Sequence, residues 1–327
     1  MITKNIFGLA AIILLLSGCS TNSRNNTIRN YSSPEKGIVL IMLSNQDKLR
    51  VRLPANFIAT SFIGVGGLPI DHMMMEKHLD KNDRFIAPIL NDVKSNSYNH
   101  LMDSKFRATL KKITWLNIEK EITLSKFNKN FQPIGTHVLA LDRKYEFTPT
   151  MDSMEMTVFL SLKKVVGYGY RHNKKFTRHN TIFENRYKYI SAVISPFTKK
   201  KQHMPLDEVN KIAEFESNKR VYSPDDRKQF MLGYWLQNES KKVKEFLYNA
   251  PEAVSKMILH DLLLKKNQSD EDYFDSLVEY NQFYWLISEN QDRRVLESKS
   301  WSKTGNLCSL PTDAESYRCV DNNHAWE

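Results

Sequence analysis

The feature that most constrains the fold is a period of two in the apolar residues between positions 116 and 193. Largely apolar side chains take every second position in four runs, at 116–124, 139–147, 154–162 and 187–193. Successive side chains of a strand point to opposite faces of a sheet, so this period predicts strands with one buried and one solvated face. We expect these strands to form an antiparallel meander.

Two strands and two helices are expected ahead of the meander. Residues 37–43 (GIVLIML) and 48–53 flank a turn-like Ser-Asn-Gln-Asp run, and we interpret them as a hairpin. A short helix is expected at 71–79. Apolar residues that recur every three to five positions predict a longer amphipathic helix over 91–113.

The pattern becomes helical after Pro196. Apolar residues between 206 and 215 share one helix face, and Ser-Pro-Asp-Asp at 223–226 is a typical helix start. Helical spacing continues over 246–262 with an interruption expected at Pro251, whereas residues 283–287 have the composition of a strand.

These patterns predict the α+β class, with an antiparallel β meander and flanking helices followed by a mostly helical C-terminal part. The expected domains are a sheet-rich domain over 37–200 and a mostly helical C-terminal region with a disulfide loop over 203–327. The alternative is that both parts share one core. The apolar fraction of 41% and charged fraction of 26% are ordinary for a globular body.

The first 18 residues have the organisation of a signal peptide. Lys4 precedes an apolar run from Ile6 to Leu16, shorter than the roughly 20 residues that span a bilayer as a helix. Leu-Ser-Gly then leads to Cys19, and this sequence resembles the lipobox of bacterial lipoproteins. The resemblance implies a diacylglyceryl group on the Cys19 thiol, cleavage after Gly18, and acylation of the new amino end.

The residues after Cys19 predict where the protein is held. In enteric-type bacteria an aspartate in place of Ser20 retains lipoproteins in the inner membrane, so the resemblance implies the outer membrane, with the body in the periplasm. A Gram-positive host would change this to the outer face of the cytoplasmic membrane. An ordinary cleaved signal and an uncleaved anchor are the alternatives. Residues 19–36 are expected to be the lipidated cysteine and a flexible tether of about 55 Å at most.

The other two cysteines, Cys308 and Cys319, lie close in sequence near the end of the chain. Exported proteins meet an oxidising compartment, where two such cysteines usually form a disulfide. Two unpaired thiols are the alternative. The spacing is not that of a zinc site.

The strongest charge feature is a basic segment from residue 163 to 201, with eleven Lys or Arg and a single acid, Glu184. Aromatic residues are interleaved with the cations, and a turn expected at 173–175 would make the segment a protruding basic hairpin. A hairpin that is basic only for solubility is the alternative. The candidate residues for binding an anionic partner are Lys163, Lys164, Arg171, Lys174, Lys175, Arg178, Arg186 and Lys188. Residues 270–297 carry eight acids against two arginines, which indicates a separate acidic face.

Known catalytic and metal motifs are not evident in the sequence. The Asp-His-Met-Met-Met-Glu-Lys-His run at 71–78 places His72 and His78 on different helix faces, so we predict no metal site. The glycines at 64–67 lack the rest of a phosphate loop, and no nucleophile elbow or HExxH motif occurs. We therefore expect no cofactor and assign no catalytic residues.

The sequence predicts an envelope lipoprotein that acts as a non-catalytic binding or assembly factor. It would be tethered through acylated Cys19 and would engage a protein partner or an anionic envelope polymer. Nucleic acid is not an expected partner, because export separates the protein from it. A periplasmic hydrolase or transferase with a scattered active site, and a component of a secretion or surface-assembly machine, are the alternatives.

Overall fold

The computed structural model describes most of the chain from Tyr31 onward. The described residues are 31–43, 46, 48–53, 69–93, 95–124, 132–171, 174–192, 210, 224–267, 272, 276–299, 305–314 and 319. The predicted signal peptide, Cys19 and the predicted helix face at 206–215 lie outside this set, apart from residue 210.

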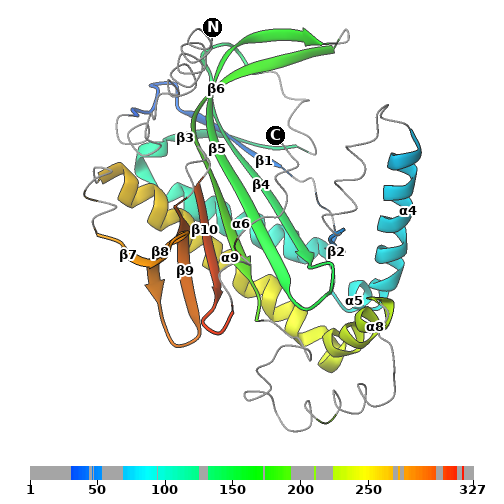
Figure 1. The fold of residues 1–327 in the computed structure, drawn as a ribbon. Helices are drawn as coiled ribbons and strands as arrows, with labels where there is room; N and C mark the ends of the chain where they lie inside the picture. The colour runs from blue at the N-terminus through cyan, green and yellow to red at the C-terminus, as the bar shows by residue number, and fades with distance from the viewer. Residues whose placement is uncertain are drawn as a thin grey trace, which may run out of the picture.

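A ten-stranded mixed sheet organises the described residues, with the order β3-β1-β4-β5-β6-β10-β9-β8-β7 and the short β2 paired with β4 (Figure 1). The strands are β1 (Ile38–Leu43), β2 (Arg50–Val51), β3 (Ile118–Leu124), β4 (His137–Phe147), β5 (Met154–Arg171), β6 (Lys174–Ile190), β7 (Val278–Asn281), β8 (Tyr284–Glu289), β9 (Arg293–Ser298) and β10 (Gly305–Pro311).

The predicted meander is confirmed for β4, β5 and β6, which are antiparallel neighbours. The predicted hairpin of residues 37–43 and 48–53 is wrong. β1 lies between β3 and β4 and is parallel to both, while β2 pairs with the far end of β4. The apolar composition of β1 explains its place, because a strand between two neighbours and under cover on both faces needs apolar side chains on both.

The C-terminal part is not mostly helical, and the predicted fold class is wrong in this respect. Strands β7 to β10 continue the sheet, and β10 pairs in parallel with β6 over Asn185–Tyr189. The two predicted parts therefore meet in a single sheet. Only residues 283–287 were expected to form a strand there. Strands as short as these give a weak period-two pattern.

Five described helices accompany the sheet: α4 (Pro69–Phe85), α5 (Ala87–Asp92), α6 (Ser95–Lys111), α8 (Pro224–Trp235) and α9 (Gln237–Asn267). A 3-10 turn, Thr114–Leu116, follows α6. The helices expected at 71–79 and 91–113 are confirmed as α4 and α6 with shifted ends. The expected interruption at Pro251 is wrong, since α9 runs through it. The break falls earlier, where Asn238, Glu239 and Ser240 adopt left-handed conformations.

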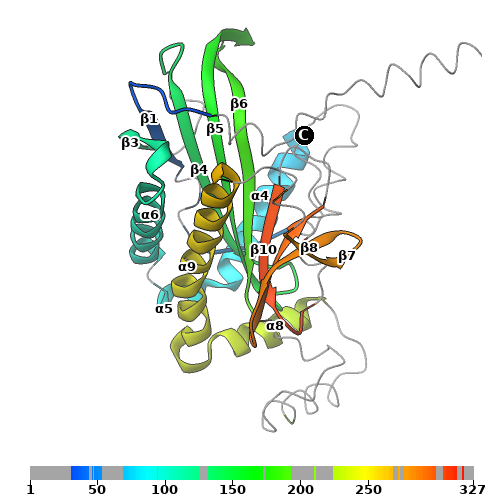
Figure 2. The same ribbon diagram turned by 90° about the vertical axis from the view of Figure 1, so that its left-hand side faces the viewer.

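The main core lies between the sheet and the helices on one of its faces. Figure 2 shows α6 and α9 side by side along this face. Alternate residues of β5 from Met154 to Leu162 pack there, against residues of α9 spaced three or four apart, such as Val243, Phe246, Val254 and Ile258. On the opposite face, a smaller cluster joins Ile190 and Leu296 to Cys308, Leu310 and Cys319.

Candidate binding surface on the β5–β6 hairpin

Strands β5 and β6 extend beyond their neighbours as a two-stranded arm. The pairing of β4 with β5 ends at His137 and Lys164, and β10 contacts β6 only over Asn185–Tyr189. Past this point the two strands pair with each other, from Val165 opposite His179 to Arg171 opposite Lys174. We call residues 165–179 the arm. Its six-residue advance from Val165 corresponds to about 20 Å, and Figure 1 shows it projecting past the sheet.

Local features of the sequence set where the arm leaves the sheet. The strand register shifts after Leu162 and again after Val165, and such bulges bend a strand and increase its twist. The hydroxyl of Tyr168 donates to the carbonyl oxygen of Gln132 at 2.8 Å, which ties the arm to the turn before β4. A side chain at Gly169 would collide with the ring of Phe176, so glycine lets this ring approach the backbone of the opposite strand.

The arm exposes several large apolar side chains to solvent. The exposed fractions are 50% for Val166, 75% for Tyr170 and 43% for Phe176, and Ile134 in the adjoining turn is 61% exposed. The arm also holds the cations Arg171, Lys174, Lys175 and Arg178 and no acid. Exposed aromatic rings thus lie in a segment whose charged residues are all cations.

The predicted binding residues divide into groups by position. Lys164, at the base of the arm, is exposed, and so is Arg178 on the arm itself. Lys163 is half-buried, with its Nζ 3.9 Å from Glu184 Oε2, and the guanidinium of Arg186 lies 4.6 Å from the centre of the Phe159 ring. Backbones of Arg171, Lys174 and Lys175 belong to the arm, but their side chains lie outside what the structure describes.

Lys188 lies in the interior and does not belong to this surface. Its Nζ is 3.1 Å from Oε2 of Glu155, and the same oxygen is 2.7 Å from Nη1 of Arg52. The period of two places Lys188 on the strand face opposite Tyr187 and Tyr189, which the sequence predicts to be solvated. In fact the opposite face is also covered at this level, so Lys188 is only 3% exposed.

Two histidines flank the base of the arm. Burial, and then the positive charge of Lys163, hold the pKa of His179 below its ordinary 6.5. Burial, followed by the charge of Lys164, does the same for the pKa of His137. Both rings are therefore mostly neutral at pH 7, and the positive charge of this region at that pH comes from lysine and arginine.

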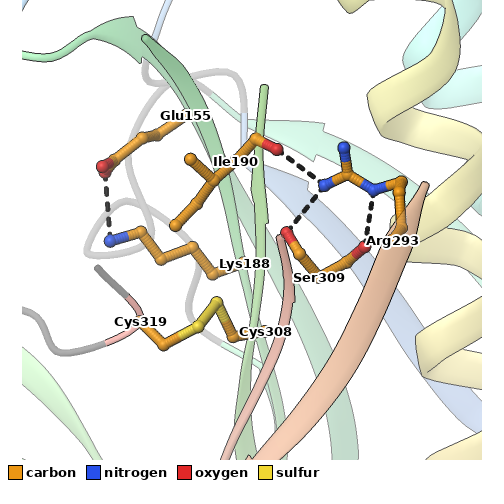
Figure 3. Close-up of a disulfide and its surroundings, with 7 residues drawn as sticks. All are labelled: Glu155, Lys188, Ile190, Arg293, Cys308, Ser309 and Cys319. Carbon is orange, nitrogen blue, oxygen red and sulfur yellow. Dashed lines mark hydrogen bonds and ion pairs between the residues drawn. A yellow bond between two sulfur atoms is a disulfide. The ribbon is translucent and has the colours of Figure 1, made fainter. Parts of the chain in front are cut away.

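The predicted disulfide between Cys308 and Cys319 is confirmed by the geometry, with a Cα–Cα distance of 5.7 Å. Figure 3 shows it on the same side of the sheet as Lys188. Arg293 lies on the other side, where its Nη2 donates to the carbonyl oxygens of Ile190 at 2.6 Å and Ser309 at 2.9 Å. It thereby links β9 to β10 and to the end of β6.

A groove of about 550 Å³ lies between α9 and strands β8 to β10. Glu252, Lys256 and His260 line it from α9, and Arg293 and Ser309 line it from the strands. Lys256 Nζ lies 3.1 Å from Glu252 Oε1, and a hydrogen bond from that lysine is the main reason that the pKa of Glu252 is lowered. Arg293 Nε donates to the Ser309 hydroxyl at 3.0 Å. Glu252 and Ser309 in this groove are thus each engaged by a cation.

Two further findings concern the described residues. No helix among them has both the length and the apolar character needed to cross a bilayer. The same part of the chain contains no group of three or more His, Cys, Asp or Glu side chains arranged to hold a metal ion.

Comparison of the chain with protein-family models, with curated proteins and with solved structures gave no match. The chemistry of the arm therefore has to follow from its own residues.

Proposed function

We propose that this protein is a lipid-anchored, non-catalytic binding factor of a bacterial cell envelope that engages an anionic partner through the arm. The observation that carries the proposal is the arm itself, which extends past the sheet, exposes Tyr170 and Phe176, and has four cations and no acid. The signal-like N-terminus and the lipobox resemblance at Cys19 support the anchor and the compartment. The lipobox resemblance implies more than one acyl chain at Cys19. Two or more acyl chains are enough for stable attachment to a membrane.

Charge reversal on the arm tests this role. Lys164→Glu combined with Arg178→Glu changes two exposed cations at the base and on the arm. Lys77→Glu with Lys241→Glu is the matched control, because these lysines are exposed on α4 and α9, away from the groove, and the change in net charge is the same. Crosslinking in intact cells followed by mass spectrometry should show partners lost from the arm variant and kept in the control. Identical partners in both variants and the unmodified protein would exclude the arm as the binding element.

The mature protein from its native host tests the anchor. Its mass should correspond to a chain that starts at Cys19 and carries acyl groups. An unmodified Cys19 thiol would contradict the lipid anchor. Stable copurification with a large membrane complex would identify the protein as a component of a secretion or surface-assembly machine rather than a separate binding factor.

A further inference from the structure

The chain enters the folded body beside the base of the arm. The ring of Tyr31, the first described residue, lies 5.5 Å from the ring of His137 and 6.0 Å from that of Trp115, centre to centre. The backbone oxygen of Tyr31 also accepts a hydrogen bond from Lys266 at the end of α9. His137 is the residue of β4 that pairs with Lys164, where the arm begins.

This entry point limits how the body can stand relative to its anchor. Cys19 precedes Tyr31 by twelve residues, which span about 40 Å at most. The arm extends about 20 Å from the level at which β4 leaves β5, close to Tyr31. An anchor at Cys19 therefore keeps the arm end of the sheet within reach of the membrane surface.

The composition of the arm suits that surface. Aromatic side chains favour the boundary between headgroups and hydrocarbon, and cations next to them are attracted to anionic lipids. Tyr170 and Phe176 are exposed, Arg178 is exposed between them and the base, and no acid in the arm opposes the attraction. The acids Glu279, Glu289 and Asp292 belong to the β7–β9 region, which Figure 1 shows away from the arm.

We propose that the arm docks onto the anionic phospholipid headgroups of the membrane that holds the acylated Cys19. The cations contact lipid phosphates. The rings of Tyr170 and Phe176 lie on opposite faces of the arm, so both enter the headgroup boundary when the arm meets the membrane with its tip. This inference rests on the proposed function, because it names the anionic partner of the same arm. Docking would fix the orientation of the body and turn the α9 groove and the acidic strands β7 to β9 toward other envelope components.

Vesicle binding by a chain without lipid tests the proposal. The protein is the full mature chain, residues 19–327, with Cys19→Ser, so that only the body and its tether can bind. It should float with phosphatidylcholine vesicles that contain phosphatidylglycerol and not with pure phosphatidylcholine. The binding should weaken as salt is added, because salt screens exposed charges.

Three variants locate the contact. Arg178→Gln should weaken partitioning about fivefold, the contribution of one cation near an anionic surface. Tyr170→Ser with Phe176→Ser should weaken it at least as much, although the charge is unchanged. Lys241→Gln, an exposed change on α9, should have no effect. Equal melting temperatures of all variants would show that the body remains folded.

The outcomes separate this inference from the proposed function. Absence of binding to phosphatidylglycerol vesicles, or equal binding by the arm variants and the control, would overturn membrane docking. If arm-dependent protein crosslinks persisted in cells at the same time, the arm would have a protein partner, and the proposed function would stand. An unmodified Cys19 in native protein would overturn the proposed function whatever the vesicles show.

Discussion

Lys188 on β6 and Glu155 on β5 form a buried ion pair, with 3.1 Å between Nζ and Oε2 and side chains that are 4% and 6% exposed. The same carboxylate oxygen lies 2.7 Å from Nη1 of Arg52, which is also 3.7 Å from Oε1 of Glu146. Taking charges out of water is costly, so this arrangement is sensitive to the loss of any one member. A lysine that a charge count assigns to a binding surface is thus part of the interior.

Lys188→Ala should destabilise the protein by about 3 kcal/mol. Removing one partner of a buried pair costs about 3–5 kcal/mol, and Arg52 remains to compensate part of the charge on Glu155. Urea unfolding followed by circular dichroism measures the change. Lys163→Ala is the control, because its ion pair with Glu184 is long and partly exposed, and about 0.5 kcal/mol is expected there. Equal losses in both variants would contradict the structural role of Lys188.

Tyr187→Phe should cost about 1.5–3 kcal/mol of stability. The Tyr187 hydroxyl donates to Oδ2 of the fully buried Asp261 at 2.6 Å, and hydrogen bonds to carboxylates are stronger than those to neutral acceptors. Tyr168→Phe, which removes a bond to a backbone carbonyl, should cost about 1 kcal/mol. A thermal or urea unfolding series that ranks these two variants in the reverse order would contradict the stronger hydrogen bond at Tyr187.

Loss of the Cys308–Cys319 disulfide should lower stability by up to about 3 kcal/mol. The sequence separation of 11 residues closes a short loop, and the chain-entropy model limits the gain from such a loop. The variant with both cysteines changed to alanine should unfold at lower urea than the oxidised protein. Reductant should move the midpoint of the native chain but not that of the variant. If reductant also moved the unfolding midpoint of the variant, its effect would come from a site other than this disulfide.

Stability should fall as the pH drops below 6.5, in part because of His137 and His179. Each has a folded-state pKa below 6.5, so the unfolded chain binds protons more readily than the folded one in this range. The stability from the neutral rings is complete above 6.5 and is lost as pH falls through the lowered folded pKa values. His137→Gln with His179→Gln should reduce the slope of unfolding free energy against pH from 6.5 down to about 5. An unchanged slope would rule out this contribution.

Several elements were predictable because their signals are local. The period of two from 139 to 162 gave β4 and β5, since one face of each strand packs under the helices. The Ser-Pro-Asp-Asp run predicted a helix at 223–226, and α8 begins at Pro224. Cysteine spacing predicted the disulfide. In each case neighbouring residues carry the whole signal.

The errors concern elements that depend on distant neighbours. Residues 37–53 resemble a hairpin locally, but β1 is placed between β3 and β4, each about 80 or more residues further along the chain. The strands β7 to β10 were largely missed because their sequences have only a weak strand pattern. Pairing with β6 and with one another stabilises them as strands. Pro251 did not end α9, since packing of the helix on the sheet outweighs one lost hydrogen bond.

For the candidate surface, the sequence by itself determined the sign and density of charge and the presence of rings among the cations, because both are properties of composition. It also supplied the lipobox resemblance at Cys19. Only the tertiary structure decided that Arg178 and Tyr170 are exposed while Lys188 is buried with Glu155. The physical reason is that the exposure of a strand residue depends on what covers its face, and at Lys188 that cover comes from segments remote in the sequence.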